Sequence, residues 1–202
     1  EQAMEQIADT VVIEGNSEED VRRLAALKVA IKRMCVENEC TCVAIQCWTA
    51  LQTGLGIMPC MVNGMLAEEG LPVVCETDIH GAITAILLQE ASLRESPVFF
   101  ADLTVRHPEN DNTELLWHCG NFPPSLADEN SSRELGRHFI FPDHKCGTGE
   151  WKIKNGDVTI LRFDGDHGEY RMFIGEGKGV DGPKTKGTYI WLEVDNWPKW
   201  EK

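Results

Sequence analysis

The sequence predicts an α/β region followed by a mainly β region, with the change near residue 97. Through residues 1–96, apolar runs alternate with amphipathic stretches, which is typical of βαβ units built around a parallel sheet. From residue 97 onward, short strand-like runs follow one another, separated by turn clusters such as PENDN and KNGD. Many short strands of this kind favour a sandwich or a barrel.

The first region contains a strong helix signal over residues 17–38. Ser17 is a good N-cap, and the acidic residues that follow it suit the positive end of a helix dipole. Apolar residues then recur from Val21 to Met34 with helical spacing. The run TCVAIQCW after this helix predicts a short strand over residues 41–48.

A second strand and two further helices complete the first region. The run CMVNGMLAEEG predicts a helix closed by Gly70. PVVCE, residues 72–76, predicts a buried strand, and a helix follows it with Thr77 or Asp78 as the cap. Because ligands of open α/β sheets bind outside the carboxyl ends of the strands, Glu76 lies where a ligand is expected.

The second region is predicted to consist of strands. The strand-like runs cover residues 98–106, 113–120, 137–142, 151–154, 157–163, 169–175 and 188–194. In the first of them the period is two, which places Phe99, Ala101, Leu103 and Val105 on one face and Asp102 on the other. Asp102 therefore lies on a mixed face near a domain junction, a common place for a ligand site.

Composition and charge exclude several classes of partner. The 202 residues carry a net charge of −14, which argues against nucleic acids and anionic membrane surfaces. No apolar run approaches the ~18 residues of a membrane span, and the chain does not open on a signal peptide. The eight cysteines include no CxxC pair, so we expect reduced, mostly buried thiols in a cytoplasmic protein.

Glu76 and Asp102 are the main candidate functional residues. Each belongs to an apolar run, where an ionised carboxylate is costly unless it is paired, hydrogen-bonded or bound to a metal. Two carboxylates from different strands can hold a divalent cation or act as acid and base. The structural alternative, equally compatible with the sequence, pairs Glu76 with a helix N-terminus and Asp102 with Arg106.

Three weaker candidates lie on neighbouring segments. Gln46 and Trp48 end the first predicted strand, and Trp48 could stack on a sugar or simply cover the end of the sheet. His118 lies within a strand, where a lone histidine usually has a structural role. Asp78 is better explained as the cap of the helix that follows it.

The series CETDIHGAITAILL, FFADLTVRHPENDNTELLWHCGN and GTYIWLEVDNWPKW resembles the L-fucose isomerase-like family of sugar isomerases and, more distantly, L-arabinose isomerase. The resemblance begins near residue 20 and covers nearly the whole chain. It implies that residues 1–96 are the C-terminal part of a second α/β domain. Residues 97–202 would then be most of a C-terminal, β-barrel-like domain whose end is missing.

The resemblance also implies a chemistry. Members of the family interconvert aldoses and ketoses through an enediol with a divalent cation, usually Mn²⁺, and they form homo-oligomers. Glu76 and Asp102 fall on two of the family's metal ligands, which also move the proton between C1 and C2. Gln46, Trp48 and His118 would bind the sugar. The family's metal-binding histidine comes after the last matching segment, and none of the six histidines of this chain occupies its position.

Two alternatives therefore remain beside a metal-dependent isomerase. One is a catalytically incomplete sugar-binding or scaffolding fragment, favoured by the missing histidine. The other is a related lyase or epimerase that uses the same enediolate. Only the isomerase would give a ketose.

Overall fold

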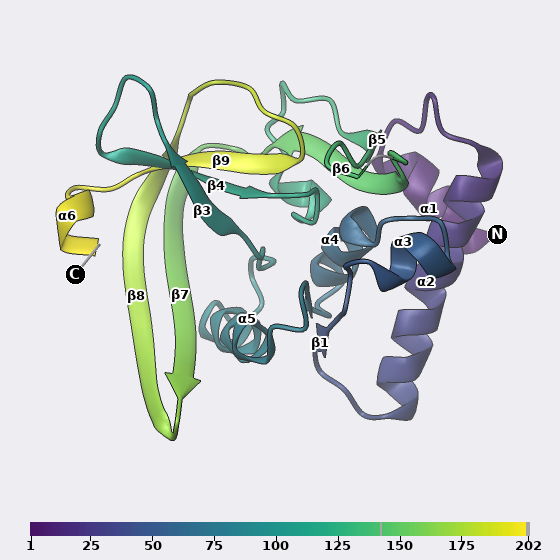
Figure 1. Ribbon diagram of the computed structural model, residues 1–202, viewed down its shortest axis with the longest axis horizontal. Helices are drawn as coiled ribbons and strands as arrows, with labels where there is room; N and C mark the ends of the chain where they lie inside the picture. Colours follow the sequence, from purple (N-terminus) through teal and green to yellow (C-terminus); the bar gives the residue numbers. More distant parts are fainter. Residues whose placement is uncertain (142, 201–202) are drawn as a thin grey trace.

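The computed structural model describes residues 1–141 and 143–200. It begins with two helices, α1 (Gln2–Thr10) and α2 (Glu18–Glu37), that pack against each other (Figure 1). Ser17 caps α2: its hydroxyl accepts from the backbone N–H of Asp20 at 3.1 Å, and the Asp20 carboxylate accepts from the backbone N–H of Ser17. This reciprocal capping box satisfies two N–H groups that the helix leaves unpaired. The predicted helix is confirmed.

The first region contains a parallel strand pair, as expected. β1 (Val43–Ala44) pairs with β2 (Val73–Val74) in parallel, and both are shorter than the predicted strands. The connection between them holds α3 (Ala50–Gly54) and α4 (Cys60–Glu68). Because the strands are parallel and in register, their carboxyl ends lie side by side. The residues after Ala44 and after Val74 therefore begin at the same end of the strand pair.

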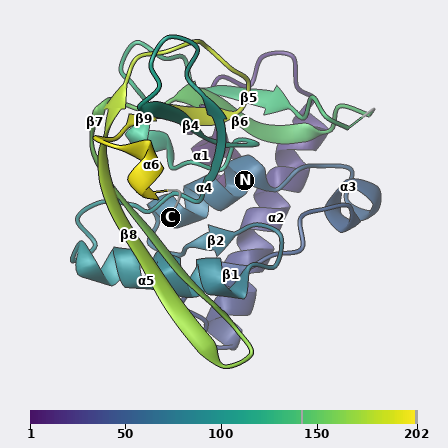
Figure 2. The ribbon, with the colours of Figure 1, turned by 60° about the vertical axis from the view of Figure 1, so that its left-hand side comes forward.

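Asp78 caps α5 (Ile79–Ala91), as predicted, and its side chain accepts from the backbone N–H of Gly81 at 2.8 Å. The same carboxylate is paired with the Arg162 guanidinium. Arg162 belongs to β7 (Gly156–Asp166), which forms a long hairpin with β8 (Glu169–Val180). Figures 1 and 2 both show α5 beside this hairpin, and the ion pair is one of the contacts that fasten it there.

The second region forms a mixed sheet. Its main path runs β3-β4-β9-β6-β5, with the β7–β8 hairpin joined through β8 to β9. The bounds are β3 (Asp102–Arg106), β4 (Thr113–His118), β5 (Glu134–Arg137), β6 (Cys146–Lys152) and β9 (Thr188–Glu193), with the short helices η1 (Pro124–Leu126) and α6 (Trp197–Trp200). Neighbours are antiparallel except β6 and β9. The β-barrel-like fold class stays a prediction.

Two predicted strands differ from the structure. The run 98–106 becomes a strand only at Asp102, and β3 is exposed throughout because it lies at the edge of the sheet. The expected buried face is therefore wrong there, with Leu103 47% and Val105 53% exposed. The run 137–142 is not a strand over residues 138–141, since β5 ends at Arg137, and its position 142 lies outside the described residues.

The main hydrophobic core draws on both predicted regions. Leu24 of α2 and Leu66 of α4 share it with Leu116 of β4 and Ile190 of β9, all at most 4% exposed. The boundary at residues 96/97 nevertheless stays a prediction, because a shared core does not test where a domain begins. Within the part of the chain that the structure describes, no helix is both long and apolar enough to cross a bilayer.

Candidate functional site

Glu76 lies in the tight turn that joins β2 to α5. Glu76 and Thr77 both have φ of +57°, a left-handed conformation that non-glycine residues seldom adopt. The turn is held by the backbone N–H of Thr77, which donates to the carbonyl of Ile45 at 3.1 Å. Strain of this kind persists only where surrounding contacts impose it, and it is often found at functional sites. The Glu76 side chain is 46% exposed, so the prediction of a carboxylate inside a buried strand is wrong for this residue.

His118, at the end of β4, faces Glu76. Its Nε2 lies 3.7 Å from Oε1 of Glu76, although the two residues come from different regions of the chain. The histidine is 2% exposed, and its Nδ1 makes no hydrogen bond within the described residues. A buried polar atom without a partner is uncommon and calls for an explanation such as a missing ligand.

Asp102 begins β3, opposite Trp117 of β4, so it lies beside His118. The residue keeps solvent-exposed surface, which corrects the expectation of a buried carboxylate. Crowding by its neighbours still desolvates the carboxyl group, and this desolvation is the main reason that the pKa of Asp102 is raised. The charge of Glu76 raises this pKa further, and His118 opposes the shift. The three residues thus act on one another electrostatically.

The predicted structural alternative for the two acids finds little support. Arg106 is paired with Glu114 at 2.8 Å, and the cap of α5 is Asp78 rather than Glu76. The contacts of Glu76 are instead with His118 and with Cys47.

Cys47 and Cys75 belong to the same site, which the sequence did not indicate. Cys47 follows β1 and Cys75 follows β2; the sulfur of each, together with a carboxylate oxygen of Glu76, lies within 4.8 Å of the others. The Cys75 thiol donates toward Cys47, which lowers the pKa of Cys47 and raises that of Cys75. Parallel pairing of β1 with β2 was the one available signal, because it brings residues 47 and 75 to one edge.

The remaining predicted residues lie along the same edge. Gln46, two residues after the end of β1, is exposed. Trp48 is 38% exposed and packs against Phe141 and His138, with ring centroids at 4.5 and 5.8 Å. His138 is fully buried, its Nε2 has no partner among the described residues, and burial lowers its pKa, so its imidazole is neutral near pH 7. Sequence reasoning did not select His138, which lies in a run predicted to be a strand.

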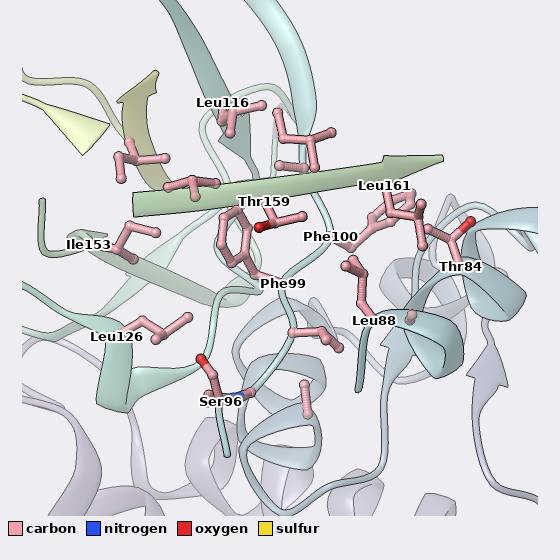
Figure 3. A pocket seen from close by; sticks show the side chains of 18 of the residues that line it. Thr84, Leu88, Ser96, Phe99, Phe100, Leu116, Leu126, Ile153, Thr159 and Leu161 are labelled. Carbon is pink, nitrogen blue, oxygen red and sulfur yellow. The ribbon is translucent and has the colours of Figure 1, made fainter. Parts of the chain in front are cut away.

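A pocket of 620 Å³ opens beside this cluster. Figure 3 shows its lining, with Thr84 and Leu88 of α5 on the same side as Leu161 of β7, and with Phe99 beside Thr159. The lining is mainly apolar and includes Asp102, but Glu76 is not part of it. The pocket therefore meets the candidate site only at Asp102.

Comparison with known proteins gives sugar isomerases as relatives. No family model matches the chain. It is 33% identical over 172 residues to sulfoquinovose isomerase of Alkalicoccus urumqiensis, covering 84% of this chain and 38% of that protein. It is 31% identical over 180 residues to the sulfoquinovose isomerases of Priestia aryabhattai and Priestia megaterium, covering 88% of this chain and 39% of each.

The chain thus spans about two fifths of the length of the curated relatives it matches. All three relatives bear the name of an isomerase that acts on a sugar, which supports the predicted relationship to sugar isomerases. The finer assignment to the L-fucose type stays a prediction.

Proposed function

We propose that this chain forms the metal and proton-transfer site of an aldose–ketose isomerase of the L-fucose and L-arabinose type, and that its substrate is sulfoquinovose. The substrate comes from the names of the relatives, which share 31–33% of aligned residues with this chain. The observation that carries the proposal is the approach of His118 to Glu76, at 3.7 Å, beside Asp102.

These residues suit a divalent cation, which we propose to be Mn²⁺. Glu76 and Asp102 offer the carboxylate oxygens that hard cations prefer, and the imidazole of His118 offers a nitrogen. Among the described residues, Nδ1 of His118 has no hydrogen-bond partner, which supports a role for this ring beyond packing. His118 thereby takes the place of a third ligand in the proposal, beyond the sugar-binding role that the sequence indicated. When bound, the cation would polarise the sugar carbonyl and stabilise negative charge on its oxygens.

Within this site the two carboxylates would move one proton. Isomerisation takes a proton from one of the two carbons C1 and C2 and returns a proton to the other, through an enediol. Glu76 and Asp102 enter from two segments, so one can accept the proton while the other returns it. Without a bound cation, desolvation raises the pKa of Asp102, so its neutral form persists to higher pH than that of an ordinary Asp.

Two side chains at the same edge would hold the sugar. The exposed face of Trp48 can stack on the apolar face of a pyranose, and its packing against Phe141 keeps the indole in place. Gln46 offers amide hydrogen bonds to sugar hydroxyls. A homo-oligomeric assembly and a cytoplasmic location stay predictions.

The test follows sulfoquinovose by NMR in D₂O with the chain and Mn²⁺. We expect the ketose to appear with deuterium at the carbon that received the proton. Glu76→Gln and Asp102→Asn should each slow its formation by at least about 100-fold, the usual cost of losing a general acid or base. Glu95→Gln is the matched control, because Glu95 is an exposed acid that follows the C-terminal end of α5, whereas Glu76 precedes its N-terminal end.

Each result decides between the candidates. Sugar binding without conversion would refute turnover by this chain and support the sugar-binding alternative. A product other than a ketose would support the lyase or epimerase. Conversion that survives both carboxylate substitutions would refute the roles of Glu76 and Asp102.

A further inference from the structure

Two buried thiols and one carboxylate meet at the edge where β1 and β2 end. Cys47 is 1% exposed and Cys75 is fully buried, and both are free. Their sulfur atoms and a Glu76 oxygen lie within 4.8 Å of one another. Neither thiol has a role in the proposed isomerisation. Thiolates are soft ligands that select cations such as Zn²⁺ over Mn²⁺.

We propose that Cys47, Cys75 and Glu76 form a binding site for a thiophilic divalent cation of the Zn²⁺ or Cd²⁺ class, with Nε2 of His118 as the fourth ligand. Two sulfurs, one oxygen and one imidazole nitrogen make a donor set that tetrahedral zinc accepts. This site overlaps the proposed manganese site, because both use Glu76 and His118, and it differs in using sulfur in place of Asp102.

Two of the separations between these donors are close to those of a tetrahedral site. With zinc bonds of about 2.3 Å to sulfur and about 2.0 Å to oxygen and nitrogen, neighbouring donors should be about 3.5 Å apart for sulfur and oxygen and about 3.3 Å for nitrogen and oxygen. The corresponding separations are 3.8 Å between Cys47 Sγ and Glu76 Oε1, and 3.7 Å between His118 Nε2 and the same oxygen. An ion would need to draw each of these two pairs together by only a few tenths of an ångström. The imidazole of His118 is not among the ligand atoms that all lie within 4.8 Å of one another, so it would have to move farther to complete the site.

The surroundings of Cys75 also suit a thiolate ligand. Two buried amides donate toward its sulfur, Asn63 Nδ2 at 3.5 Å and Asn121 Nδ2 at 3.8 Å. Amide N–H groups around a sulfur stabilise negative charge on it and fix its orientation, as outer-shell partners of metal ligands do. Asn63 and Asn121 are 1% and 3% exposed, so no water competes freely for these bonds.

The site has a functional consequence that rests on the proposed isomerase. Glu76 and His118 cannot serve both cations at once, so Zn²⁺ or Cd²⁺ would displace Mn²⁺ and stop turnover. Binding of the thiophilic cation itself does not depend on that function, and it can be measured without manganese or sugar.

The test is a Cd²⁺ titration of the chain, read by the ultraviolet charge-transfer absorption of cadmium thiolates. The parent carries Cys40→Ser and Cys42→Ser, because these two thiols lie near each other and outside the core. We expect one equivalent to bind, and Cys47→Ser or Cys75→Ser to weaken binding by more than about 10-fold, the cost of losing even an outer-shell partner. Cys146→Ser is the matched control, because Cys146 is also fully buried and lies in the core instead.

Circular dichroism establishes that each variant is folded. If a cysteine variant fails to fold, Glu76→Gln replaces it as the test, since this side chain is 46% exposed and its loss spares the core. The proposal predicts weaker Cd²⁺ binding in Glu76→Gln and release of bound Mn²⁺ by Cd²⁺ in the parent. Absence of the absorption, or its persistence at full strength in Cys47→Ser and Glu76→Gln, would overturn the thiolate site whether or not the chain is an isomerase.

Discussion

Gly64 lies where α4 meets the segment after β4, and replacing it tests how tightly these two parts are packed. A Cβ atom at Gly64 would lie 2.6 Å from the carbonyl oxygen of Phe122 and 2.9 Å from that of Asn121. Both contacts are with backbone atoms, which cannot rotate away. The backbone at Asn121 and Phe122 must therefore shift if alanine is introduced at Gly64.

The magnitude follows from two opposed terms. Alanine is favoured over glycine within a helix by about 0.8–1.0 kcal/mol, whereas overpacking of a core costs about 1–3 kcal/mol. Because the clash is with backbone, we place its cost in the upper part of that range and expect Gly64→Ala to lower the free energy of unfolding by about 1–2 kcal/mol. At about 2–4 °C per kcal/mol for a chain of this size, Tm should fall by about 2–8 °C.

Thermal unfolding followed by circular dichroism measures this effect. The matched control is Gly54→Ala, the same substitution in helix α3, where no atom lies within 4 Å of the new Cβ. Gly54→Ala should raise Tm, because only the helix preference remains. If Gly64→Ala raised Tm as much as the control, the close approach of α4 to the segment carrying Asn121 would be refuted. The support that Asn121 gives to Cys75 would then also be in doubt.

Three further predictions concern capping and charge. Ser17→Ala should lower the free energy of unfolding by about 1 kcal/mol, measured by urea unfolding, because the cap of α2 is lost. Partial burial acts to raise the pKa of Glu69, but hydrogen bonds from Lys28 and Lys32 outweigh it and lower this pKa. Glu69 therefore contributes stability above the pKa of an unfolded glutamate, about 4.3, and loses it as the pH falls through the lower folded-state value. The difference in stability between the chain and its Glu69→Gln variant should accordingly shrink in acid; a constant difference would contradict the lysine pairing. The pKa shift of Asp102 is in the opposite direction to that of Glu69. Desolvation raises the pKa of Asp102, so its ionised form opposes folding near neutral pH. Asp102→Asn should raise Tm at pH 7 and lose this advantage in acid, and a lower Tm at pH 7 would show a structural role instead.

Local signals in the sequence were sufficient for helices α2, α4 and α5 and for the position of Glu76, but not for α1 (Gln2–Thr10) or α3 (Ala50–Gly54). A capping box and a helical apolar period involve residues a few positions apart, so α2 was predicted from Ser17 onward and α5 from Asp78. The position of Glu76 after a strand of a parallel pair could be predicted for the same reason, because one short run and the helix after it define the carboxyl end.

Exposure of the strands was decided by the tertiary structure. An apolar run such as residues 98–106 predicts a buried strand. In the structure β3 is exposed to solvent because it is the outermost strand of the sheet. Nothing within a run of nine residues encodes whether a neighbour covers it, since burial depends on which strands pair beside it.

The sequence by itself predicted helices α2, α4 and α5, because caps and helical apolar periods depend on residues a few positions apart. It also indicated the parallel pairing of the first region, through the alternation of strand and helix, and selected Glu76 and Asp102 as candidates. It did not predict α1 or α3. Only the tertiary structure brought His118 to Glu76. These two residues are separated by tens of positions, and their meeting depends on how the mixed sheet packs against the β1–β2 pair through a shared core. A single sequence carries no direct record of that packing, so the approach of His118 to Glu76 could not be predicted from it, whereas the parallel pairing of β1 with β2 could have indicated that Cys47 lies near Cys75.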